Sequence, residues 1–295
     1  MKSIVFIILG FFLLIKGADI LVKGASNIAV KFHIPEIIVG LTIVSIGTSL
    51  PELMISIKSA INGASDISLG NVLGSCICNI LLILGTSSIF CKIPIDKESR
   101  KALLPLTLIS MTIIFIFGNI AIFMIYIVIN SLKQIETEKS EIQTSIFKNI
   151  IYLVIGAVGL KFGGDFVVNE ASNIARVFNI SEKIIGLTIV SIGTSLPELV
   201  TSVVAGKKGN TAIAFGNIIG SNLFNLLLVL GLSSAIQPID YSYSFNFSLI
   251  LLMLVTLLVL VFDKIGEKSY LNKKKGWIML LMYVEYMFFL IYQMP

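Results

Sequence analysis

The amino-acid sequence contains two long copies of the same segment. Residues 38–53 read IVGLTIVSIGTSLPEL and residues 184–199 read IIGLTIVSIGTSLPEL, which are identical at fifteen of sixteen positions. The same offset of 146 residues aligns GNVLGSCICNILLILG (70–85) with GNIIGSNLFNLLLVLG (216–231), with nine identities in sixteen. Self-similarity at a fixed offset means that one structural unit is used twice. We therefore expect two homologous halves, with the repeated motifs at 38–85 and 184–231.

Long apolar runs alternate with short charged clusters. Hydrophobic residues make up 56% of the chain and charged residues 13%, whereas a soluble domain has about 25% charged residues. About 20 apolar residues suffice to cross a bilayer as a helix, and the alternation of a membrane β-barrel is missing. We expect an all-α polytopic membrane protein with about ten transmembrane helices. The expected spans are 3–31, 36–57, 68–90, 102–117, 120–132, 146–177, 182–205, 211–235, 244–262 and 276–293.

An odd number of spans in each half predicts that the two copies cross the membrane in opposite directions, as in the inverted repeats of many transporters. The halves would be residues 1–132 and 146–295, joined by a cytoplasmic linker at 133–145. Most Lys and Arg residues then fall in cytoplasmic connections, so both termini are expected outside. The net charge of +5 follows from these loops, and no nucleic-acid partner is expected. Residues 102–132 could form one helix instead of two short ones.

Each repeat places a glutamate among hydroxyls inside a membrane span. Spacings of three and four residues put these side chains on one helix face. An ionisable residue within a span is costly and indicates a functional site. The first copy carries Ser45, Thr48, Ser49 and Glu52, and the second carries Ser191, Thr194, Ser195 and Glu198.

Prolines next to the glutamates predict broken helices. Pro51 and Pro197 lack the N–H group that would bond the carbonyls of Gly47 and Gly193, and a break at membrane depth is tolerated where it lines a cavity. Carboxylates, hydroxyls and carbonyls together suit hard cations such as Ca²⁺ and Na⁺. The following spans extend this oxygen-rich set, although small polar residues also serve helix packing. Their polar residues are Asn71, Ser75 and Asn79 in the first half and Asn217, Ser221 and Asn225 in the second.

The paired GTSLPE motifs, each followed by GNxxGS, resemble the α-repeats of the cation/calcium antiporter superfamily, specifically its prokaryotic sodium/calcium exchanger branch. The resemblance covers both halves. It implies a secondary active antiporter of the prokaryotic plasma membrane that exchanges Ca²⁺ for Na⁺ by alternating access, with about three Na⁺ per Ca²⁺. It also implies Ca²⁺ binding by Glu52 and Glu198. The implied Na⁺ sites are lined by Thr48, Ser49, Thr194, Ser195, Ser75 and Ser221, with Asn79 between them and main-chain carbonyls at Ser45 and Ser191.

The sequence departs from some relatives in ways that bear on ion selectivity. Asn225 stands where several members carry Asp and potassium-dependent ones are usually acidic. Gly74-Ser75 and Gly220-Ser221 stand where the proton-coupled branch is acidic, which favours sodium. A Ca²⁺/H⁺ antiporter using the same glutamates remains the alternative, and a cation channel is less favoured. Without a histidine pair, nucleophile motif or phosphate loop, we expect no enzyme, no cofactor and no obligate protein partner.

The remaining polar residues have simpler explanations. Asp19 and Asp165 are expected to form ion pairs within their helices, with Lys16 and Lys161 respectively. His33 is expected at a membrane interface. Glu285 lies inside the last span without an evident partner, and we expect it to reach toward the outer surface.

Overall fold

The computed structural model describes residues 2–63, 65–95, 99–117, 145–178, 191–237, 245–265 and 270–292. Over these ranges five helical spans are long and apolar enough to cross a membrane, and a sixth is a helix pair bent by 50°. The prediction of a helical membrane protein is therefore confirmed. The expected span at 120–132, most of the linker at 133–145 and the start of the span at 182–205 lie outside the described residues.

The elements of the first half follow the apolar runs. Helix α1 (Lys2–Phe32) is continuous. A bent helix comes next, made of α2 (Glu36–Val39), the π-helical η1 (Gly40–Val44), α3 (Ser45–Thr48) and α4 (Leu50–Ile61). A second composite helix consists of α5 (Ser65–Cys78), the π-helical η2 (Asn79–Leu84) and α6 (Gly85–Phe90). It is followed by η3 (Ser99–Leu103) and α7 (Leu104–Phe117).

The second half repeats this order. Helix α9 (Ile146–Val177) corresponds to α1, and α11 (Ser191–Thr194) with α12 (Leu196–Lys207) corresponds to α3 and α4. The second composite helix is α13 (Thr211–Leu223), η5 (Phe224–Val229) and α14 (Leu230–Ile236). Helices α15 (Asn246–Lys264) and α16 (Lys273–Tyr292) complete the described chain.

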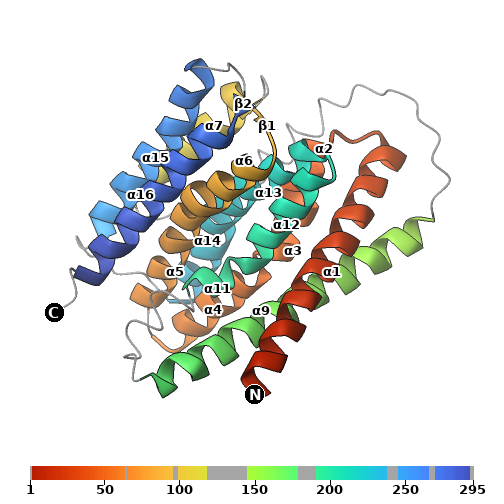
Figure 1. Cartoon of the computed structure of the whole chain (residues 1–295). Helices are drawn as coiled ribbons and strands as arrows, with labels where there is room; N and C mark the ends of the chain where they lie inside the picture. The colour runs from red at the N-terminus through yellow and green to blue at the C-terminus, as the bar shows by residue number, and fades with distance from the viewer. Residues whose placement is uncertain are drawn as a thin grey trace.

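The helices that carry the repeated motifs lie at the centre of the molecule. Helix α1 and helix α9 cross on one side of them, and α7, α15 and α16 cover the other side (Figure 1). Within an apolar window of 18 residues, 94% of the residues at Thr211–Ile236 and 72% at Ile67–Phe90 are buried, compared with 28% in α1 and 22% in α9. Helices α1 and α9 have exposed apolar faces that suit contact with lipid, while the motif helices are enclosed by protein.

Helices α1 and α9 pack antiparallel through glycines. A Cβ atom added to Gly10 would lie 2.8 Å from the carbonyl oxygen of Gly163, and one added to Gly17 would lie 2.8 Å from that of Gly156. Gly10 and Gly17 are the repeat equivalents of Gly156 and Gly163, so exchanging the two halves converts one contact into the other. Such close backbone approach requires small residues. These equivalent helices therefore run in opposite directions.

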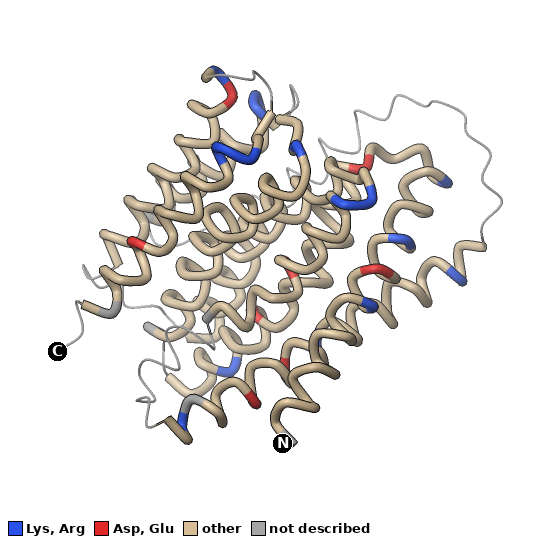
Figure 2. Tube along the Cα trace, viewed as in Figure 1, with Lys and Arg blue, Asp and Glu red and all other residues tan. Residues whose placement is uncertain are grey.

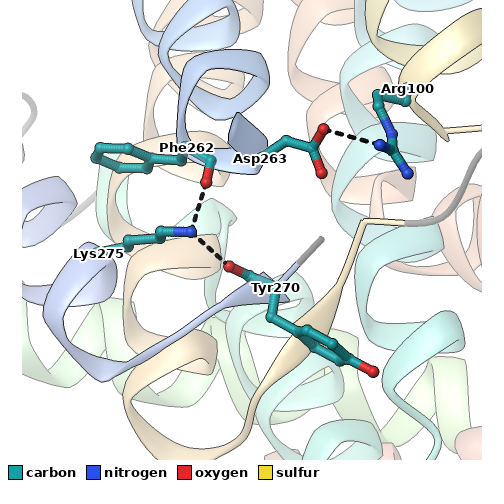
Figure 3. A network of polar contacts seen from close by, with 5 residues as sticks. All are labelled: Arg100, Phe262, Asp263, Tyr270 and Lys275. Atoms are coloured by element: carbon teal, nitrogen blue, oxygen red, sulfur yellow. Dashed lines mark hydrogen bonds and ion pairs between the residues drawn. The ribbon is translucent and has the colours of Figure 1, made fainter. Parts of the chain in front are cut away.

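A small polar assembly joins the outer helices, and the sequence analysis did not predict it. Ile93–Pro94 (β1) and Tyr270–Leu271 (β2) form a short antiparallel pair. Figure 3 shows the buried Lys275 donating to the carbonyls of Phe262 and Tyr270, the latter at 2.8 Å. Arg100 contacts Asp263 at 3.1 Å. A lysine on a terminal helix carbonyl complements the helix dipole, so this assembly secures the end of α15.

The basic residues are distributed unevenly along the helices. Figure 2 shows most Lys and Arg residues at one end of the molecule, the upper end as drawn, and few at the other. The first turn of α1 and the last turn of α16 lie toward the lower end.

Candidate cation site

Two helix breaks create the site. The helix is interrupted at Ser49, with φ −87° and ψ 8°, and at Ser195, with φ −89° and ψ 4°. In each case a proline occupies the first turn of the following helix, where its missing N–H costs nothing. Glu52 and Glu198 also lie in these first turns, where the helix dipole favours negative charge. The predicted breaks beside Pro51 and Pro197 are confirmed.

The two glutamates are enclosed in the protein. Glu52 is 1% exposed and Glu198 is 0% exposed, and the two carboxylates are close enough to repel each other. One oxygen of each, Oε2, has no hydrogen-bond partner among the described residues. Burying an uncompensated charge is very costly, so this pair requires a bound cation or protons.

Each carboxylate faces hydroxyls from both halves. Ser49 donates a 2.8 Å hydrogen bond to Oε1 of Glu198, and the hydroxyls of Thr48 and Ser221 lie beside the same carboxylate. The hydroxyls of Thr194 and Ser75 lie beside Glu52 in the equivalent arrangement. The structure thus assembles one site from both repeats.

Asn71 and Asn217 support the backbone at the glutamates. Asn217 donates to the carbonyl of Glu198 at 3.4 Å and to the hydroxyl of Ser202 at 3.0 Å. Asn71 donates to the carbonyl of Glu52 at 3.2 Å and to the hydroxyl of Ser56 at 2.9 Å. The sequence analysis missed both serines, although each follows its glutamate by four residues in both repeats. These amides are engaged in holding the first turns of α4 and α12.

The other predicted ligands differ in how far their polar atoms are occupied. The Ser45 hydroxyl donates to the carbonyl of Leu41 at 2.5 Å, while its own carbonyl accepts from Thr48 at 3.3 Å. The hydroxyl of the buried Ser195 has no partner in the described ranges. The side chain of Ser191 lies outside the description. Asn79 and Asn225 are 1% and 0% exposed.

Several buried oxygens at the site lack partners. A buried polar atom without a hydrogen bond costs about 1–3 kcal/mol, and ligation of a cation would remove that cost for an oxygen. Among the predicted ligands, the oxygens without a partner in the described part of the chain are Oε2 of Glu52 and Glu198, Oδ1 of Asn79 and Asn225, and the hydroxyls of Ser195 and Ser221. This donor set fits a hard cation. No three His, Cys, Asp or Glu side chains gather anywhere in that part.

The asparagines lie on π-helical turns that the sequence analysis did not predict. Asn79 is the first residue of η2, and Asn225 is the second residue of η5. A π turn inserted in an α-helix is frequent at functional sites. Here it occurs at equivalent places in both repeats, beside the glutamates.

The two repeats differ in their packing beside the site. A cavity of about 210 Å³ separates α9 from α4, lined by residues that include Pro51, Met54, Asp165, Thr194 and Pro197. The equivalent helices α1 and α12 pack together instead. Asp19 contacts Lys208 there, so its expected pairing with Lys16 is wrong because a tertiary partner takes its carboxylate. Asp165 pairs with Lys161 at 2.8 Å as predicted.

The comparisons with known proteins agree with this architecture. The family model for sodium/calcium exchanger proteins matches residues 2–146 and again residues 148–292. This chain belongs to that family. The sodium/calcium exchanger MaX1 of Methanosarcina acetivorans is 30% identical, with 97% of each chain covered. The inner membrane protein YrbG of Escherichia coli is 34% identical, with 79% of each covered.

Solved exchanger structures have the same fold. The sodium-calcium exchanger NCX_Mj soaked with Na⁺ and Ca²⁺ superposes with a TM-score of 0.83 at 31% identity, and 97% of each chain is covered. The predicted membership of the prokaryotic sodium/calcium exchangers is confirmed. Exchangers of this family transport Na⁺ and Ca²⁺ and form a class of transporters.

Proposed function

We propose that this exchanger moves Ca²⁺ against Na⁺ across the prokaryotic plasma membrane by alternating access to the Glu52/Glu198 site. The observation that supports this most directly is the pair of buried carboxylates, which occupy equivalent positions and face hydroxyls from the opposite repeat. Two ionised glutamates carry two negative charges, which one Ca²⁺ balances. The neutral oxygens around them suit Na⁺ in the other half of the cycle.

The proposed ligands are those that the sequence analysis selected. Glu52 and Glu198 would compensate the charge of Ca²⁺, while hydroxyl, amide and carbonyl oxygens would complete its shell and hold Na⁺. These further ligands are Thr48, Thr194, Ser49, Ser195, Ser75, Ser221, Asn79, Asn225, Ser45 and Ser191.

We further propose about ten spans in two inverted halves, residues 1–132 and 146–295, with both termini outside. The antiparallel packing of the equivalent helices α1 and α9 supports the inversion. The two matches of the family model, which meet near residue 147, support the division. The basic residues gathered at one end of the molecule support a cytoplasmic location for that end.

Sodium-driven calcium uptake into proteoliposomes tests the function. Uptake should follow an imposed sodium gradient, and Glu52→Gln and Glu198→Gln should each abolish it, because a divalent ion in a buried site needs compensating charge. Glu285→Gln is the matched control: Glu285 also lies in a membrane helix but is exposed on the outer helix α16. Near wild-type exchange by either site variant would contradict the assignment, and uptake that follows only a pH gradient would indicate proton coupling.

The charge balance predicts electrogenic exchange. About three Na⁺ on the two carboxylates would leave one net positive charge on the carrier, and the membrane potential acts on it by about 2.3 kcal/mol per 100 mV. An inside-negative potential should therefore favour sodium entry and calcium extrusion. Calcium flux measured with potassium and valinomycin clamps tests this. Sodium-dependent flux that ignores the potential would indicate two Na⁺ per Ca²⁺.

A further inference from the structure

The two repeats differ at a polar position near the centre of the molecule. Position 76 is Cys, and its repeat equivalent, position 222, is Asn. Both side chains are fully buried, and the two residues are in direct contact. Asn222 donates from Nδ2 to the carbonyl oxygen of Cys76 at 3.3 Å. The Cys76 thiol lies 3.8 Å from the carbonyl oxygen of Asn222.

These contacts determine the orientation of a second amide. A backbone carbonyl can only accept a hydrogen bond, so Asn222 must present its nitrogen to Cys76. Its Oδ1 then faces Asn79 and accepts from Nδ2 of that residue at 2.9 Å. With its nitrogen engaged, Asn79 directs its oxygen elsewhere, and that Oδ1 has no partner among the residues described.

The helix position of Asn79 puts it next to the cation site. Asn79 follows Ser75 by one helical turn, so the two share a helix face, and Ser75 lies beside the Glu52 carboxylate. We infer that Asn222 is a positioning residue, which holds Asn79 with its carbonyl oxygen toward the transported cation. This inference rests on the proposed function.

The equivalent amide in the other half has no such support. Asn225 corresponds to Asn79, but the residue that corresponds to Asn222 is Cys76, whose thiol offers no amide oxygen. Both polar atoms of the Asn225 side chain lack partners in the described ranges. Asn225 can therefore present either its oxygen or its nitrogen, whereas Asn79 presents only oxygen. One side of the site is oriented in advance and the other is not.

Exchanging the two residues tests this inference. Asn222→Cys removes the acceptor and should raise the Ca²⁺ dissociation constant about two- to tenfold, the range for one hydrogen bond. Adding Cys76→Asn to that variant gives Asn225 the support that Asn79 has lost, because positions 76 and 222 are related by the repeat. The double variant should bind Ca²⁺ within about twofold of the wild-type chain. A residue needed only for packing would show no such rescue.

The readout is calorimetric Ca²⁺ binding by the full chain purified in detergent, which needs neither a gradient nor a coupled ion. A double variant that binds no better than Asn222→Cys, or an Asn222→Cys variant with unchanged affinity, would overturn the inference alone. A wild-type chain that binds no Ca²⁺ would overturn the proposed function as well. If Asn222→Cys does not fold, Asn79→Ala decides: its loss of affinity should be partly recovered by Cys76→Asn, and no recovery refutes the positioning role.

Discussion

The contact between Lys208 and Asp19 joins α1 to the end of α12, where these helices pack together although their equivalents α9 and α4 line a cavity, and its removal should favour opening between α1 and α12. The ammonium group also donates to the main-chain oxygen of Asp19 at 3.3 Å. The two side chains are 37% and 46% exposed, so the pair resembles a surface ion pair worth about 0.2–1 kcal/mol. Lys208→Gln should then raise the population of the state that is open between α1 and α12, relative to the state observed here, by about 1.4- to 5-fold.

Single-cysteine labelling measures that ratio. In a background without Cys76, Cys78 and Cys91, a cysteine at Val200, the repeat equivalent of the cavity residue Met54, reports opening between α1 and α12. Its labelling rate should rise by the stated factor in Lys208→Gln, because the minor state limits the reaction. High salt should move the unmodified chain toward the variant, since it screens exposed charges.

Lys161→Gln provides the matched control. Lys161 and Asp165 form an i,i+4 pair within α9 at 2.8 Å, with side chains 53% and 48% exposed. Because both residues belong to one helix, breaking this pair releases no second helix. The control should leave labelling of the Val200 cysteine unchanged, and the swapped pair Asp19→Lys with Lys208→Asp should restore the slow rate. Equal effects of Lys208→Gln and Lys161→Gln, or a swap without recovery, would refute the reasoning.

Three further predictions follow from the fold and the site. Gly156→Ala should lower the free energy of unfolding of the detergent-purified protein by about 1–3 kcal/mol, because the added Cβ would lie 2.6 Å from the Cβ of Leu21. Gly70→Ala is the control, since its Cβ would meet only Phe245 at 3.7 Å. Thermal unfolding compares the two variants, and equal losses of stability would contradict the packing argument. Cysteines at Lys58 and Lys207 should react from opposite sides of the membrane, and labelling from one side would disprove the inverted halves. Potassium should be dispensable for exchange while Asn225→Asp alters monovalent selectivity, and an absolute potassium requirement would contradict this.

Local sequence patterns predicted most of the described helices. The expected span at 146–177 coincides with α9, and those at 68–90 and 211–235 differ from the observed composite helices by only a few residues. The length of an apolar run and the effect of a proline on its helix depend only on nearby residues, so both can be predicted without knowledge of the tertiary structure. The breaks at Ser49 and Ser195 follow from the same local chemistry.

Contacts between the halves could not be predicted in this way. Nothing in the local pattern shows that Ser49 bonds Glu198 rather than the glutamate of its own repeat. Asp19 was assigned to Lys16 because helical spacing allowed that pair, but Lys208 reaches it from a different helix. The roles of Ser56 and Ser202 emerge only when Asn71 and Asn217 approach from the next helix. The repeat did contain a signal for these two serines, because a serine follows the glutamate by four residues in both copies.

The glycine contacts between α1 and α9 bear on how such a chain could have arisen. Because Gly10 meets Gly163 while Gly17 meets Gly156, a protein consisting of one half could form both contacts with a second copy of itself inserted the other way up. A dimer of that kind is symmetric, with the same surface on both subunits. Duplication and fusion of its gene would preserve every such contact and free equivalent positions to diverge. The pairing of Cys76 with Asn222 is a difference that only the fused chain can encode.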